Sequence, residues 1–206
     1  MQADPIVFVV DDDSSVCQSL TWLIESVGIK VETFPSAAEF LKRHPHDGPA
    51  CLLLDVRMPG LSGFDLQNQL ATAGRVIPII FITGHGSVSM SVRAMKAGAV
   101  DFIEKPFEDQ TLLDVLSQSL EKDRQAKREQ AEKREIKQRV DSLTTREHEV
   151  FKRVVAGKLN KQIAFELGTT ERTIKAHRAR VMQKIQVHSL ADLVRLAVKA
   201  GIGLKK

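Results

Sequence analysis

Short apolar runs alternate with longer helical patterns through the first 120 residues, and this alternation limits the possible folds more than any other feature. Runs with the composition of β-strands lie at 6–10, 30–34, 50–54, 78–83 and 100–105. Apolar residues recur with helical spacing over 14–27, 36–44, 62–72, 87–97 and 107–120. Strands that alternate with helices in this way are typical of βαβ units, and continuous apolar strands favour a sheet covered on both faces. The pattern therefore predicts an α/β fold with a five-stranded, doubly wound parallel sheet.

The composition changes sharply over 121–140, where the chain reads EKDRQAKREQAEKREIKQRV. This stretch holds 8 basic and 5 acidic residues and neither Gly nor Pro. It predicts a helix that is polar nearly all round and that bridges two domains through solvent. A coiled coil is the alternative, with a seam that could consist only of Ala126, Ala131, Ile136 and Val140.

No strand pattern follows Leu143, and the spacing predicts helices over 144–156, 160–167, 170–185 and 189–200. Thr144 and Glu147 form a capping-box pattern, and Thr170 is a candidate N-cap. We therefore expect a domain over 1–121, a charged helical linker over 122–141 and an all-α domain over 142–206.

Charge is divided unevenly between the two halves of the chain. Residues 1–120 carry 8 basic and 15 acidic side chains, whereas residues 121–206 carry 22 and 11. The net charges of −7 and +11 indicate an acidic module joined to one that meets a polyanion. Cys17 and Cys51 lack metal-ligand spacing, and no apolar run is long enough to span a membrane, so we expect a cytoplasmic protein with reduced thiols.

Polar residues of different kinds follow the predicted strands. Asp11 and Asp12 end the first strand, Asp55 the third, Thr83 the fourth and Lys105 the fifth. The carboxyl ends of parallel strands meet at one rim, which is where open α/β sheets bind ligands. Clustered carboxylates bind Mg²⁺, an Asp carboxylate can attack a phosphoryl group, and Lys and Thr can hold the phosphoryl oxygens. Asp13 either joins this set or caps the first helix.

The predicted helix 170–185 has two unlike faces. Its apolar stripe runs through Ile174, His177/Arg178, Val181 and Ile185, and the opposite stripe through Arg172, Lys175/Ala176, Ala179/Arg180 and Gln183. A basic face with small residues suits the DNA major groove, although a solvated basic surface is the alternative. A net charge of +8 over 141–206 and the preceding short helix and turn favour DNA.

The motifs VVDDDSS, LLLDVRMPGLSG, FITGHGS and MKAGAVDFIEKPF resemble, over about residues 5–121, the receiver domain of bacterial two-component response regulators. The segment 143–194 resembles the LuxR/FixJ-type DNA-binding domain, and together they resemble the FixJ subfamily of NarL-type regulators. The resemblance implies a flavodoxin-like receiver and a helix-turn-helix domain. It also implies a transcription activator that a sensor histidine kinase phosphorylates and that binds double-stranded DNA and RNA polymerase as a homodimer.

By this resemblance Asp55 is the phosphoacceptor. Asp12 is the principal carboxylate for Mg²⁺ or Mn²⁺, with Asp11 in support and Arg57 lending its backbone carbonyl. Thr83 and Lys105 would contact the phosphoryl group, Phe102 would be the aromatic that turns inward, and Lys105–Pro106 matches a cis peptide bond. The aromatic in relatives is often Tyr, which this chain lacks, so its signal must pass through packing.

The resemblance also assigns residues to DNA and to a second protomer. Lys175 and Ala176 fall at positions that read the groove, with Ala179 and Arg180 on the same face. The residues expected at phosphates are Asn160, Lys161, Thr170, Arg172, Thr173, His177 and Lys184. The expected dimer face comprises Val92, Met95, Lys96 and Asp101.

Two other classes of protein remain open on sequence grounds. Mg²⁺-dependent phosphohydrolases also use an Asp nucleophile after a strand, but they usually carry a D-x-D spacing that Asp55-Val56-Arg57 lacks. The second class is an architectural protein that binds DNA constitutively. Such a protein would not need the acidic residues at the carboxyl ends of the strands. We therefore expect a regulator that catalyses only its own phosphorylation and dephosphorylation.

Overall fold

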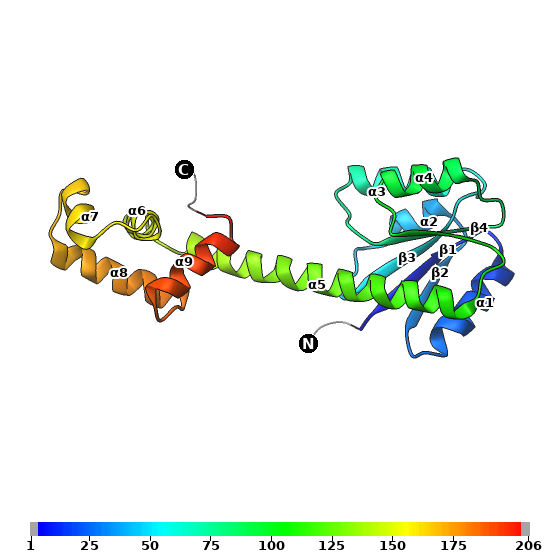
Figure 1. Ribbon diagram of the computed structural model, residues 1–206, viewed down its shortest axis with the longest axis horizontal. Coiled ribbons are helices and arrows are strands. Elements are labelled where there is room, and N and C mark those ends of the chain that lie inside the picture. The colour runs from blue at the N-terminus through cyan, green and yellow to red at the C-terminus, as the bar shows by residue number, and fades with distance from the viewer. Residues whose placement is uncertain (1–3, 203–206) are drawn as a thin grey trace. The chain divides into compact units, whose positions relative to one another are not determined.

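The computed structural model describes residues 4–202 and divides into two compact units between Lys127 and Arg128 (Figure 1). The N-terminal unit contains one sheet of parallel strands in the order β2-β1-β3-β4-β5. The strands are β1 (Ile6–Val10), β2 (Lys30–Phe34), β3 (Ala50–Asp55), β4 (Ile79–Thr83) and β5 (Asp101–Glu104). The predicted five-stranded, doubly wound α/β fold is confirmed.

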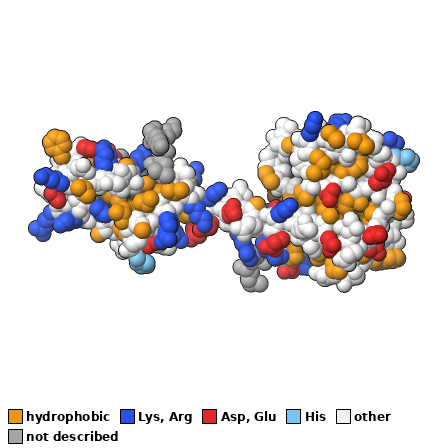
Figure 2. All heavy atoms as spheres, viewed as in Figure 1, with side chains coloured by type: hydrophobic (Ala, Val, Ile, Leu, Met, Phe, Trp, Pro, Cys, Tyr) orange, Lys and Arg blue, Asp and Glu red, His pale blue; other side chains and the backbone are white. Residues whose placement is uncertain are grey.

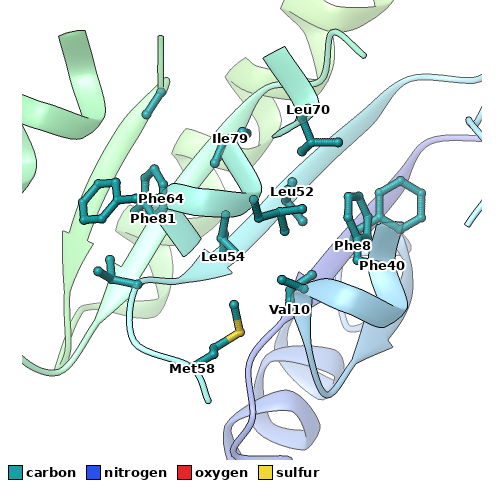
Figure 3. Close-up of a cluster of buried hydrophobic side chains, with 14 of the residues drawn as sticks. Phe8, Val10, Phe40, Leu52, Leu54, Met58, Phe64, Leu70, Ile79 and Phe81 are labelled. Atoms are coloured by element: carbon teal, nitrogen blue, oxygen red, sulfur yellow. The ribbon is translucent and has the colours of Figure 1, made fainter. Parts of the chain in front are cut away.

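Helices cover both faces of the sheet. Successive strand residues point to opposite sides, and apolar residues on both sides are buried against helices. The helices of this unit are α1 (Ser14–Glu25), α2 (Ala37–Lys42), α3 (Gly63–Thr72), α4 (Val88–Lys96) and the first part of α5 (Asp109–Asp141). Phe8, Leu52, Leu54 and Phe81 pack against α2, α3 and α4 (Figure 3). Val9, Leu53, Ile80 and Ile82 pack against α1 and α5 on the other face.

Helix α5 continues without a break through the predicted linker and is 33 residues long. Its extension is not simply solvated. The carboxylate of Asp123 is buried and accepts a hydrogen bond of 2.8 Å from the backbone N–H of Ala50, and Lys127 pairs with Asp123 at 3.0 Å. Ile136 and Val140 are buried, Val140 within the core of the C-terminal unit. These two residues are therefore covered within the chain and are not free to form a coiled-coil seam.

The C-terminal unit is entirely helical in its described residues. It contains the rest of α5 with α6 (Thr145–Val155), α7 (Asn160–Glu166), α8 (Glu171–Ile185) and α9 (Leu190–Lys199). The capping box of Thr144 and Glu147 is present, and Thr170 caps α8. Across residues 4–202, none of the helices has the length and apolar character needed to cross a membrane.

Candidate functional site

Asp11 lies at the carboxyl end of β1 and is almost completely buried, at 3% exposure. Its Oδ1 accepts a hydrogen bond of 2.9 Å from the backbone N–H of Asp13. Its Oδ2 lies 2.8 Å from the ammonium of Lys105, which follows β5. The structure therefore brings together two groups that are 94 positions apart in the sequence.

Asp55 is the last residue of β3, and it shares the same ammonium. Lys105 Nζ lies 3.8 Å from Asp55 Oδ1, while the backbone N–H of Arg57 donates to Asp55 Oδ2 at 2.6 Å. Parallel pairing of β1 with β3 places Val10 beside Leu54, so the carboxylates of Asp11 and Asp55 follow neighbouring strand ends. The predicted convergence of Asp11, Asp55 and Lys105 at one rim is confirmed.

The pKa of Asp55 is raised above its ordinary value, chiefly because burial disfavours the charged carboxylate. The negative charges of Asp11 and Asp12 raise this pKa further, while the Arg57 N–H and the Lys105 ammonium lower it. An Asp carboxylate can attack a phosphoryl group, and added positive charge nearby would stabilise its ionised form.

A close approach of α3 to the end of β3 supports Asp55, and the sequence reasoning missed it. A Cβ built on Gly63 would lie 2.2 Å from the carbonyl oxygen of Asp55. The N–H of Gly63 donates to the carbonyl of Val56 at 3.1 Å. The signal was present in the motif MPGLSG, because a glycine at the start of a helix indicates a close backbone contact.

The donor set suits a hard divalent cation. Mg²⁺ takes one or two carboxylates and completes its shell with water and phosphate oxygens. The buried carboxylates of Asp11 and Asp55 face a common cation, here the Lys105 ammonium, and Asp12 is exposed beside them. The described residues hold no group of three or more acidic, His or Cys side chains already arranged around a metal. A bound Mg²⁺ would therefore rely on water and backbone oxygens as well.

Asp13 does not belong to this set. It is the N-cap of α1, and its Oδ1 accepts hydrogen bonds from the backbone N–H groups of Ser15 and Val16 at 2.8 and 3.4 Å. The hydrogen bond from the Ser15 hydroxyl, together with these two backbone bonds, lowers the pKa of Asp13. Of the two roles that the sequence left open for Asp13, the structure favours helix capping.

The side chain of Thr83 lies at the end of β4 and is buried, at 1% exposure. Its Oγ1 accepts a hydrogen bond of 3.3 Å from the backbone N–H of His85. Phe102 on β5 is half-buried, and its ring centroid lies 6.2 Å from that of Phe81. Lys105–Pro106 is a cis peptide bond, as expected.

The residues expected at a dimer face lie on α4 and β5. Val92 and Met95 are exposed at 45% and 47%, large fractions for apolar side chains, and Lys96 is also exposed. Asp101 is half-buried, and its carboxylate accepts a hydrogen bond of 2.7 Å from the N–H of Phe102. The face is accessible within its unit, and its role in dimerisation stays a prediction.

Helix α8 has the two faces that its sequence predicts. Ile174, Val181 and Ile185 are buried in the core of the C-terminal unit. The opposite face is exposed and consists of Arg172, Lys175, Ala176, Ala179 and Arg180. Figure 2 shows Lys and Arg side chains gathered at the end of this unit where Figure 1 places α7 and α8.

Two residues expected at DNA phosphates, Asn160 and Lys184, also have partners within the unit. The guanidinium of Arg178 donates to Asn160 Oδ1 at 2.6 Å, which joins α8 to α7. Lys184 pairs with the buried carboxylate of Glu147 at 2.6 Å and lowers the pKa of Glu147 to about 2, helped by the Thr144 N–H. The sequence reasoning missed the intramolecular contact of Lys184, because its partner lies 37 positions away.

The remaining residues expected at phosphates keep their surfaces open. Lys161, Thr170 and Thr173 are exposed, and the Thr170 hydroxyl caps α8 by accepting from the Thr173 N–H at 3.2 Å. His177 is half-buried, and its buried Nδ1 has no hydrogen-bond partner. Because this nitrogen is buried, it does not lie at the surface where a phosphate would bind.

Comparisons with known proteins match both units. Residues 7–117 match the response regulator receiver domain, and residues 141–197 match the bacterial regulatory proteins of the luxR family. Nodulation protein W of Bradyrhizobium diazoefficiens is 51% identical over 197 residues, which cover 96% of this chain and 87% of that protein. Response regulator protein TmoT of Ectopseudomonas mendocina is 44% identical and covers 98% of this chain and 92% of its own length.

A solved structure is similar over nearly the whole chain. The response regulator StyR has a TM-score of 0.89 and 49% identity, covering 96% of this chain and 100% of its own. The chain therefore belongs to the FixJ/NarL-type response regulators, in which a receiver domain is joined to a LuxR-type DNA-binding domain.

Proposed function

We propose that Asp55 is the phosphoacceptor of this phosphorylation-controlled transcription regulator. The observation that carries the proposal is that the Lys105 ammonium lies between the buried carboxylates of Asp11 and Asp55. Lys105 Nζ lies 2.8 Å from Asp11 Oδ2 and 3.8 Å from Asp55 Oδ1. The ammonium is therefore near enough to pair with an oxygen of a phosphoryl group on Asp55. An oxygen of Asp55 bonds to phosphorus while the bond from phosphorus to the histidine of a sensor kinase breaks.

Mg²⁺ would be held by Asp12, Asp55 and the backbone carbonyl of Arg57, with Asp11 in support. It would neutralise charge on the phosphoryl oxygens during transfer. Thr83 gives up its contact with the His85 N–H and donates its hydroxyl to the phosphoryl group, and Lys105 pairs with a second oxygen. Phe102, already packed near Phe81, then fills the space that Thr83 leaves.

The readout is dimerisation followed by DNA binding. The exposed side chains Val92, Met95 and Lys96 on α4, with Asp101 on β5, form the face through which phosphorylated protomers pair. Pairing raises the effective concentration of the second DNA-binding unit at its half-site, so affinity rises without new contacts. RNA polymerase is the partner recruited at the promoter.

The DNA contacts come from two sets of side chains. Lys175 and Ala176 read base edges from the exposed face of α8, with Ala179 and Arg180 beside them. Those that bind phosphates are Asn160, Lys161, Thr170, Arg172, Thr173, His177 and Lys184.

Intact-mass spectrometry tests the central step. With acetyl phosphate and Mg²⁺, we expect the full chain to gain one phosphoryl group and the Asp55→Asn variant to gain none. The Asp13→Asn variant is a control, because Asp13 caps α1 and lies outside the proposed chemistry. Labelling that persists in Asp55→Asn would show that another residue accepts the group.

A further inference from the structure

We propose that Glu104 is a positioning residue that restrains the loop between β4 and α4 in the conformation of the unphosphorylated protein. The proposal rests on the proposed function, because it concerns the movement of Thr83 toward a phosphoryl group on Asp55. Its basis is a hydrogen bond between the side chain of one strand-end residue and the backbone of the loop that must move.

The bond joins β5 to the loop directly. The N–H of Gly86 donates to Glu104 Oε1 at 3.1 Å, across 18 positions of sequence. Glu104 is otherwise an exposed residue at the end of β5, opposite Thr83 in the pairing of β4 with β5. A carboxylate that accepts from a backbone N–H makes a stronger bond than a neutral acceptor does, so this single contact restrains the loop.

Gly86 leaves room for this contact. A Cβ built on Gly86 would lie 3.1 to 3.3 Å from three atoms of the Glu104 carboxyl group, which is tighter than ordinary packing. The backbone of Gly86 does not have a positive φ, so its conformation is open to other residues. An alanine at position 86 would therefore displace the Glu104 carboxyl group by a few tenths of an ångström without straining the backbone.

Thr83 and Glu104 bind successive N–H groups of the same loop. Thr83 Oγ1 accepts from His85, and Glu104 Oε1 accepts from Gly86. Beyond the loop, the Ser87 hydroxyl caps α4 by accepting from the Met90 N–H at 3.3 Å. If Thr83 turns to Asp55, the His85 N–H loses its acceptor and the loop shifts. The bond from Gly86 to Glu104 opposes that shift.

Removal of the bond should favour the active conformation before any phosphorylation. A hydrogen bond of this kind changes a two-state equilibrium by about fivefold. We therefore expect Glu104→Ala to bind DNA about fivefold more tightly than the wild type without a phosphodonor, and to accept phosphoryl groups from acetyl phosphate faster.

Glu104→Gln separates the hydrogen bond from the charge. Its amide oxygen can still accept from the Gly86 N–H, whereas its charge is lost just as in Glu104→Ala. We expect Glu104→Gln to keep part of the restraint and to gain less DNA affinity than Glu104→Ala, because a neutral amide oxygen accepts more weakly than a carboxylate. Gly86→Ala crowds the carboxyl group and should change DNA affinity in the same direction as Glu104→Ala but by less, and the double variant should add little to Glu104→Ala.

DNA titration of the four full-length variants and the wild type, with and without acetyl phosphate, decides the matter. Thermal unfolding monitored by Trp22 fluorescence checks that each receiver is folded, since Trp22 lies on α1. The proposal is overturned if Glu104→Ala binds no more tightly than the wild type, or if Glu104→Gln gains as much as Glu104→Ala. Failure of every protein, wild type included, to take up phosphate would instead contradict the proposed function.

Discussion

The ammonium of Lys105 lies 2.8 Å from a carboxylate oxygen of Asp11, a residue that is only 3% exposed. Lys105 thus places a positive charge beside Asp11, which is more deeply buried than Asp55. A divalent cation that uses Asp11 must share or displace this ammonium. In the proposed site, cation binding would therefore release Lys105 toward Asp55.

The Lys105→Met variant should therefore bind Mg²⁺ more tightly, by about fivefold, because a competing charge is removed from Asp11. Isothermal titration calorimetry of the full chain measures this affinity. Lys96→Met removes an exposed charge on α4 and serves as the control. Unchanged or weaker Mg²⁺ binding by Lys105→Met would mean that the ammonium and the metal do not compete.

Asp55→Asn should raise the free energy of unfolding of the receiver by about 1 kcal/mol at neutral pH. Burial raises the pKa of Asp55 in the folded state, so its ionisation on going from acid to neutral pH destabilises the fold. The gain should vanish in acid, where Asp55 is protonated in both states, and grow as pH rises through the folded-state pKa. Denaturant titrations followed by Trp22 fluorescence at several pH values test this, and a gain independent of pH would contradict it.

Lys184→Met should destabilise the C-terminal unit by about 1 to 3 kcal/mol, because the buried Glu147 carboxylate loses its charged partner. The pKa of Glu147 is lowered to about 2, so its contribution is complete above its ordinary pKa and is lost as pH falls toward 2. Scanning calorimetry at neutral pH and in acid measures the difference. Lys175→Met, whose side chain is exposed, is the matched control. Equal stability of the two variants at neutral pH would contradict this role.

Lys175→Ala should weaken binding to the specific site and relax base preference at one position, by about 1 to 3 kcal/mol. Lys161→Ala should weaken all sequences about equally and reduce the salt slope by about one unit. A selection experiment from random DNA, combined with gel-shift titrations at several salt concentrations, separates the two effects. The same uniform loss in both variants would contradict the division between base-reading and phosphate-binding residues.

Lys96→Glu should leave the phosphorylation of Asp55 intact while abolishing the shift from monomer to dimer. Lys96 is exposed on the proposed dimer face beside Met95, and reversal of its charge disfavours pairing. Analytical ultracentrifugation and DNA titration of the phosphorylated protein measure the two consequences together. If the phosphorylated wild type stays monomeric yet binds DNA more tightly, dimerisation is not the mechanism.

The strands and the rim were predictable because both depend on local pattern. Apolar runs predicted most of the strands, the weaker pattern KVETF predicted β2, and the polar residues at the ends of the runs predicted Asp11, Asp55 and Lys105 at one edge. The two faces of α8 were predictable for the same reason, since helical spacing alone separates Ile174 from Lys175.

Contacts between distant positions were not predictable. Asp123 accepts from the Ala50 N–H across 73 positions, and within a highly charged helix nothing distinguishes this acid from its neighbours. The pairing of Lys184 with Glu147 and the bond from Gly86 to Glu104 were hidden for the same reason. Each depends on tertiary placement, which periodicity does not encode.

The close approach of Gly63 to Asp55 has an evolutionary consequence. A methyl group at position 63 would lie 2.2 Å from the Asp55 carbonyl oxygen, so even alanine would push the end of β3 out of place. Natural variation should therefore be almost absent at position 63, while exposed positions of α3 such as Gln69 tolerate more change. A saturation library selected for phosphorylation-dependent transcription would recover glycine at position 63 as strictly as it recovers aspartate at position 55.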